Sequence, residues 1–130
     1  MTTYFTARDD EAAAAALESA PTGDETMTSD IKPGSDAFAH LLELVWGKAR
    51  DELAGDQGVR TTSAEGVFRL GDALVTEVAE RDQDELGDLV SPWLESVPSL
   101  QDEGLDDFLN DLQHVCRHAK AVDQPVYAVG

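Results

Sequence analysis

Hydrophobic residues recur at helical spacing from Leu105 to Val122, and this is the clearest pattern in the chain. The apolar positions, separated by steps of three or one, are Leu105, Phe108, Leu109, Leu112, Val115, Cys116, Ala119 and Val122. These steps make one stripe on a helix of about 3.6 residues per turn, whereas a strand would divide them between two faces. Acidic residues come early in the segment and Arg117, His118 and Lys120 come late, as the helix macrodipole favours. We therefore predict a long helix packed on the core.

Other segments predict shorter helices. Asp9 to Leu17 combines an acidic start with a run of alanines, which have high helix propensity. We expect that Pro21, Thr22, Gly23 and Asp24 end this helix. A second helix is predicted from Asp36 to about Ala54, with Ser35 as its N-cap. Its stripe consists of Phe38, Leu41, Leu42, Val45, Ala49 and Leu53. A third is predicted over Ala73–Arg81, with Asp72 as its N-cap.

The region between Asp82 and Gly104 also has helical spacing. Asp82, with Glu85 three residues on, resembles a capping box with an acidic cap. Pro92 interrupts the pattern, so either one helix is kinked there or a new short helix begins. We prefer the second, with Ser91 as its cap and Pro92 at its first position. Pro98–Gly104 is interpreted as a linker.

Short β-prone segments complete the pattern. Strands are predicted over Thr2–Ala7, Gly66–Leu70 and Val126–Val129, with Tyr4 and Phe5 on opposite faces of the first. Thr26–Lys32 is either an edge strand or an extended loop, and Val59–Ala64 is expected to be a loop. The whole chain, residues 1–130, is thus predicted as a single small α+β domain. We expect about five helices packed on a three- to four-stranded sheet that includes both termini.

The strong negative charge of the chain restricts the classes of partner that it can bind. The chain carries 27 acids against 9 bases, for a formal net charge of −18. Such a surface repels phosphate groups, so we expect neither nucleic-acid nor membrane binding. Three interpretations remain open: halophilic adaptation to high salt, a surface for a basic protein partner, or an acidic surface without a specific role. The acid-rich run Asp82–Asp88 is either a solvated helix face or charge presented to such a partner.

Cys116 is the only cysteine, and it falls on the apolar stripe of the last helix. A buried and unreactive thiol is therefore expected, without an internal disulfide. Residues 1–6 have neither a basic region nor an apolar signal core. Together with the lack of a membrane-spanning apolar run, this predicts a cytoplasmic protein.

The candidate chemistry lies on the polar face of the last predicted helix. Asp107, Asp111, His114 and His118 follow one another at steps of four, three and four, so they share a stripe. Two imidazoles one turn apart with a nearby carboxylate can chelate Zn²⁺. The metal-site prediction is therefore His114, His118 and Asp111, with His40 able to join if the two helices pack suitably. The alternative is a solvated stripe without a ligand.

Catalytic motifs are absent from the sequence. It contains neither a Gly-x-Ser-x-Gly elbow nor a nucleotide-binding glycine pattern. Cys116 is expected to face inward, so a cysteine–histidine pair is not supported. Trp46 and Trp93 are interpreted as core or core-edge residues. We predict no catalytic residues and no cofactor-binding residues.

The order of elements resembles that of the YfbM-like family of uncharacterised bacterial proteins, a domain of unknown function. The points of similarity are Tyr4-Phe5, Ile31-Lys32, Leu41-Leu42, Trp46-Gly47, Leu70–Ala79, and the closing helix Leu105–Ala121 followed by Val126–Val129. The resemblance covers most of the chain and implies a fold. It implies no reaction and no site residues.

The function expected from the sequence is a non-catalytic protein–protein interaction module of a regulatory or immunity type. Its partner would be a basic protein, steered by charge. The alternative is a small metal-binding protein or hydrolase-like enzyme centred on His114 and His118.

Overall fold

The computed structural model describes residues 2–18, 26–49, 52–53, 55–62, 64–102 and 104–129. These residues form one antiparallel sheet of five strands in the order β2-β1-β5-β4-β3. The strands are β1 (Thr2–Thr6), β2 (Met27–Ser29), β3 (Val59–Thr61), β4 (Val67–Leu70) and β5 (Val126–Val129). The two terminal strands pair at the centre, with Thr3 opposite Val129 and Thr6 opposite Val126. The α+β class is confirmed, and the expected strand number was too low.

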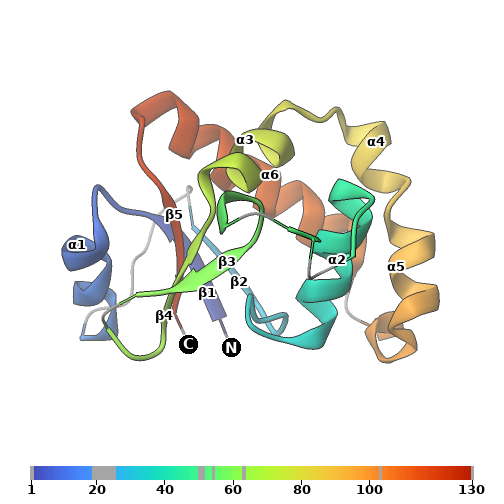
Figure 1. The fold of residues 1–130 in the computed structure, drawn as a ribbon, viewed down its shortest axis with the longest axis horizontal. Coiled ribbons are helices and arrows are strands. Elements are labelled where there is room, and N and C mark those ends of the chain that lie inside the picture. Colours follow the sequence, from blue (N-terminus) through green and yellow to red (C-terminus); the bar gives the residue numbers. More distant parts are fainter. Residues whose placement is uncertain are drawn as a thin grey trace.

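Helices cover both faces of this sheet (Figure 1). They are α1 (Asp10–Ala14), α2 (Asp36–Trp46), α3 (Asp72–Glu80), α4 (Gln83–Gly87), α5 (Val90–Ser96) and α6 (Leu105–Val122). In Figure 1, α1 lies on one side of the sheet and the remaining helices lie on the other. Among the described residues, no helix is both long enough and apolar enough to cross a membrane.

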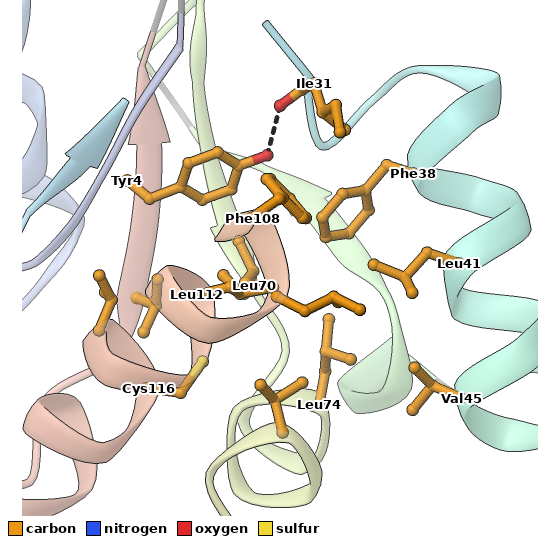
Figure 2. Close-up of a cluster of buried hydrophobic side chains, with 14 of the residues drawn as sticks. Tyr4, Ile31, Phe38, Leu41, Val45, Leu70, Leu74, Phe108, Leu112 and Cys116 are labelled. Atoms are coloured by element: carbon orange, nitrogen blue, oxygen red, sulfur yellow. Dashed lines mark hydrogen bonds between the residues drawn. The ribbon is translucent and has the colours of Figure 1, made fainter. Parts of the chain in front are cut away.

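The larger core lies between the sheet and the helix layer of α2 to α6. The predicted stripe of α6 is buried there from Leu105 to Ala119, whereas Val122, its last predicted member, is 41% exposed. The bounds of the helix are those expected from the spacing. Tyr4 on β1 meets Phe108 on α6 edge to face, with ring centroids 6.0 Å apart. The Tyr4 hydroxyl donates a hydrogen bond of 2.6 Å to the carbonyl oxygen of Ile31 (Figure 2). This bond satisfies the one polar atom of a ring that is otherwise in apolar surroundings.

The smaller core lies on the opposite face of the sheet, under α1. Strand alternation places Phe5, Val67, Tyr127 and Val129 there, and Ala13 of α1 packs on them. Phe5 and Tyr127 stack with centroids 6.1 Å apart. Tyr4 and Phe5 therefore point to opposite faces, as predicted.

Helix α2 ends earlier than its apolar pattern suggested. Ser35 is the predicted N-cap, and its Oγ accepts from the Phe38 N–H at 3.3 Å. The helix stops at Trp46 because Gly47 adopts the left-handed conformation with φ 63°. Its N–H bonds the Glu43 carbonyl at 2.8 Å, which closes the last turn. The predicted extension to Ala54 was wrong.

The region predicted as a loop over Val59–Ala64 contains β3, so that prediction was wrong. Val59, Arg60 and Thr61 pair with Leu70, Arg69 and Phe68 of β4. β3 is an edge strand with little side-chain burial, so it needs few apolar residues, and Val59 is its only one. The apolar alternation that would predict a strand is therefore missing. The ambiguous segment Thr26–Lys32 contains the other edge strand, β2.

Two predicted helix caps were also wrong. Asp72 is the first residue of α3 rather than its cap, since its carboxylate bonds the Arg69 guanidinium at 3.2 Å. Helix α5 begins at Val90, before Ser91, so Pro92 is its third residue. Asp82 does cap α4, accepting from the Glu85 N–H at 2.8 Å. The preference for two helices over one kinked helix is confirmed, but the break lies at Asp88–Leu89 and not at Ser91.

The remaining predictions concern the linker, the two tryptophans and the end of the first helix. The linker Pro98–Gly104 contains a 3-10 helix over Pro98–Asp102. Trp93 is fully buried and donates to the Ala37 carbonyl at 2.8 Å, and half-buried Trp46 donates to the Gln57 carbonyl at 2.8 Å. Both tryptophans are core or core-edge residues, as predicted. The expected stop at residues 21–24 lies outside the described residues.

Candidate functional site

The predicted metal residues lie on the outward face of α6. Asp111 and His114 are exposed and His118 is half-buried. In the described part of the chain, no group of three or more His, Cys, Asp or Glu side chains is placed to hold a metal ion. His40 on α2 therefore does not complete a cluster with the α6 residues. The two histidines remain one helical turn apart, so the metal site stays a prediction with at most two imidazole ligands.

A Zn²⁺ titration tests that prediction directly. Wild-type protein and a His114→Ala, His118→Ala double variant would be compared by calorimetry. Binding lost in the double variant would support the metal site, and equal behaviour of the two proteins would contradict it.

Cys116 is fully buried, as its place on the stripe predicted. Burial raises the pKa of its thiol from 9 to about 12, because the thiolate would be unsolvated there. The reactive form is thus disfavoured near neutral pH. This residue belongs to the core.

A polar network that sequence reasoning missed joins α1 to the sheet. The Tyr127 hydroxyl donates to Asp10 Oδ1 at 2.6 Å. The same oxygen lies 3.8 Å from Arg69 Nη1 and 3.9 Å from Arg60 Nη2, and Arg69 also bonds Asp72. The network could have been found only from the pairing of Arg69 with Tyr127 across β4 and β5, and that pairing is known only once the register of the two strands is known.

Two hollows flank this network, and neither has an excess of charge. One, of about 300 Å³, has two bases facing two acids: Arg69 and Lys120 against Asp72 and Asp123. The other, of about 480 Å³, has three of each: Arg8, Arg60 and Arg69 against Asp9, Asp10 and Glu11. Because the charges are balanced, we interpret the network as a structural link rather than an ion site.

The opposite end of the molecule has a very different charge distribution. Residues 82–116 contain ten acids and neither lysine nor arginine. The exposed acids of α4 with its C-cap, α5 and the first half of α6 are Asp84, Glu85, Asp88, Glu95, Asp106, Asp107 and Asp111. We call these seven residues the acidic face. Figure 1 shows α4 and α5 at the end of the molecule away from α1.

The acidic face has no internal counter-ions in the described residues. The ion pairs of the described residues all involve acids outside the acidic face, such as Glu77, whose carboxylate lies 2.9 Å from Arg81 Nε. Nearby bases are engaged elsewhere, since Arg117 donates to the Ala79 carbonyl at 3.0 Å and Lys120 to Thr76 Oγ1 at 3.1 Å. The potential over this face is therefore not cancelled locally.

Two hollows lie along the start of α6 within this region. One, of about 280 Å³, lies between α5, the 3-10 turn and α6. The other, of about 250 Å³, lies between β2 and α6. Both include Gly104 and Asp107 in their linings, so they adjoin. Acids line each of them, and no base among the described residues lines either.

Comparison with known proteins adds nothing to this description. No protein-family model matches the chain, and no match was found among curated proteins or solved structures. The resemblance to the YfbM-like family therefore stays a prediction.

Proposed function

We propose that the protein is a non-catalytic, cytoplasmic binding module whose acidic face docks a basic protein. The observation that supports this proposal is the separation of charge between the two ends of the molecule. At the α1 end, Asp9 and Asp10 are paired with arginines, whereas the acids of the acidic face are exposed and without counter-ions among the described residues.

Unpaired surface charge of one sign raises the rate of encounter with an oppositely charged partner. It also rejects partners of like charge, which include nucleic acids and anionic membranes. A basic protein is the class of macromolecule that this field selects. Regulation or neutralisation of such a partner is the corresponding role.

The test is affinity capture with two baits at the salt concentration of the native cytoplasm. The first bait is the wild-type chain, and the second carries Asp88→Asn, Glu95→Gln and Asp111→Asn. We expect one stoichiometric basic protein on the first bait, eluted by salt and reduced at least tenfold on the second. Each neutralised residue is exposed, so the second bait should fold normally.

Two outcomes of the capture experiment would contradict the proposal. Capture of no basic protein at stoichiometric level, or equal capture by both baits, would overturn the proposal. Circular dichroism of the second bait verifies that a lost interaction does not reflect unfolding.

A further inference from the structure

The hollow between α5 and the start of α6 combines apolar and polar lining surface. Its apolar lining comes from three elements and consists of Val90, Leu94, Leu100 and Leu105. Val90 and Leu94 are one turn apart on α5 and half-buried, whereas Leu100 and Leu105 are buried in the core. The hollow is thus an opening onto the core, and its volume of about 280 Å³ accommodates an aliphatic side chain.

Carboxylates line one side of this opening, and we call Asp106, Asp107 and the neighbouring Asp111 the acid rim. Asp106 and Asp107 stand in the first turn of α6, where the helix dipole stabilises negative charge. Asp107 also lines the adjoining hollow, together with Asp30 and Asp111. Asp106 and Asp107 therefore line the apolar opening, and Asp111 and Asp30 line the adjoining hollow from α6 and from the residue after β2. None of these four exposed acids has a basic partner among the described residues.

The combination restricts the possible occupant. A second copy of this chain carries a net charge of −18, so the acid rim repels it. A purely polar basic segment would satisfy the rim but leave the apolar hollow open to water. A segment with an aliphatic residue between lysines or arginines satisfies both features.

We propose that this hollow receives one aliphatic side chain of a basic segment from the partner protein, with its flanking cations on Asp106, Asp107 and Asp111. The inference rests on the proposed function and specifies where on the acidic face the partner is anchored. Burial of the aliphatic residue supplies affinity, and the carboxylates supply orientation.

The test uses two synthetic probe peptides and nitrogen-15 NMR of the full chain. One peptide has a single leucine in the centre of eight lysines, and the other has serine in its place. We expect the leucine peptide to bind at least tenfold more tightly, the factor that follows from burying most of a leucine side chain. Its largest shifts should fall on Val90, Leu94 and Gly104–Asp107.

Matched variants of the protein locate the rim. Asp106→Asn with Asp107→Asn should weaken the leucine peptide at least fivefold, whereas Asp84→Asn with Glu85→Gln on α4 should change its affinity less than twofold. Both double variants remove two charges from a first helical turn, so their effects on stability are comparable.

Each result has one meaning. Equal binding of the two peptides, or shifts confined to α4, would overturn the docking hollow while the proposed function stands. Binding of neither peptide at low salt would overturn both. A stronger effect from the α4 variant than from the α6 variant would also overturn the hollow.

Discussion

Gln113 joins two helices through its side-chain amide. It is 2% exposed on α6, although its polar character suggested the solvent side. Its Nε2 donates to the carbonyl oxygens of Val78, at 3.1 Å, and Arg81. Those carbonyls are at the C-terminal end of α3, where helical partners run out. The buried stripe of α6 thus includes a position that its polar side chain, and not its spacing, had left out of the predicted apolar set.

We predict that Gln113→Leu destabilises the protein by about 1–3 kcal/mol, because it removes the side-chain donor to the buried Val78 carbonyl and leaves the Arg81 carbonyl with only the 3.5 Å bond from Arg117 Nη2. Urea unfolding measures the loss. Gln83→Leu, at an exposed site on α4, is the control and should change the free energy of unfolding by less than about 0.5 kcal/mol. A wild-type midpoint for Gln113→Leu would contradict the capping role.

The two tyrosines make stability depend on high pH. Burial and the hydrogen bond to Asp10 raise the pKa of Tyr127 from 10 to about 12, and burial raises the pKa of Tyr4 further. Because the folded pKa exceeds the unfolded one, this stabilisation is complete below pH 10 and is lost as pH rises through about 12. Between its unfolded and folded pKa values each tyrosine contributes a slope of up to about −1.4 kcal/mol per pH unit, and for Tyr127 the slope falls to about half of this at pH 12.

Urea unfolding across that pH range tests this prediction. Tyr127→Phe should be less stable below pH 10, because it loses the bond to Asp10, and its stability should fall less steeply above. The slope that remains belongs to Tyr4. An unchanged slope in Tyr127→Phe would show that Tyr127 titrates normally in the folded protein.

At the scale of elements, the ends of helices depend on single backbone positions. Gly47 ends α2 with φ 63°, a conformation that costs an L-residue roughly 1 kcal/mol. Gly47→Ala should therefore lower the free energy of unfolding by about 1 kcal/mol. Gly87→Ala is the matched control, since Gly87 is helical and its Cβ would meet no atom within 4 Å.

The control should stabilise the protein, by roughly 0.4–1 kcal/mol, because alanine reduces the entropy of the unfolded chain. Thermal unfolding of the two variants side by side gives the comparison. Destabilisation by both substitutions to the same extent would mean that backbone conformation at Gly47 is not what ends α2.

Elements with a strong apolar period could be predicted from the sequence, and elements fixed by pairing could not. Helix α6 and strand β5 have the predicted bounds because their burial follows a local pattern. Strand β3 was missed because hydrogen bonds to β4, rather than its own side chains, define it. The Asp10–Tyr127 contact joins residues 117 positions apart and depends on the strand order.

The same limit applies to the candidate site. The run Asp82–Asp88 was visible as an acidic segment, and the negative charge of the whole chain predicted a basic partner. The hollow beside Asp107 could not be predicted, since α5, the 3-10 turn and α6 form it only when they pack together. The sign of the charge could thus be predicted from the sequence, whereas the position of the carboxylates around the hollow depends on how the helices pack.

At the scale of the whole molecule, charge repulsion opposes folding. The net charge is −18, and the acidic face concentrates part of it on three neighbouring helices. Salt shortens the Debye length from about 10 Å at 0.1 M to about 3 Å at 1 M, which removes repulsion between exposed carboxylates. We therefore predict that the melting temperature rises with KCl up to molar concentrations.

The acids that contribute most to this effect are those away from helix N-termini. Asp88 follows α4, Glu95 is in the last turn of α5, and Asp111 is near the middle of α6, so the helix dipole does not favour them. Asp88→Asn, Glu95→Gln and Asp111→Asn together should raise the melting temperature at low salt and flatten its dependence on KCl. The charge-preserving set Asp88→Glu, Glu95→Asp and Asp111→Glu should keep the wild-type dependence.

The salt series also separates halophilic adaptation from partner binding. Adaptation requires a steep rise in melting temperature that continues to molar KCl, because the folded state then depends on screening. A partner surface requires only that the isolated chain tolerates its charge, and binding should weaken as salt increases. A flat melting temperature between about 0.1 and 2 M would exclude adaptation, since screening is nearly complete by about 1 M. A partner surface and an acidic surface without a specific role would then remain, and salt-sensitive capture of a basic protein separates these two.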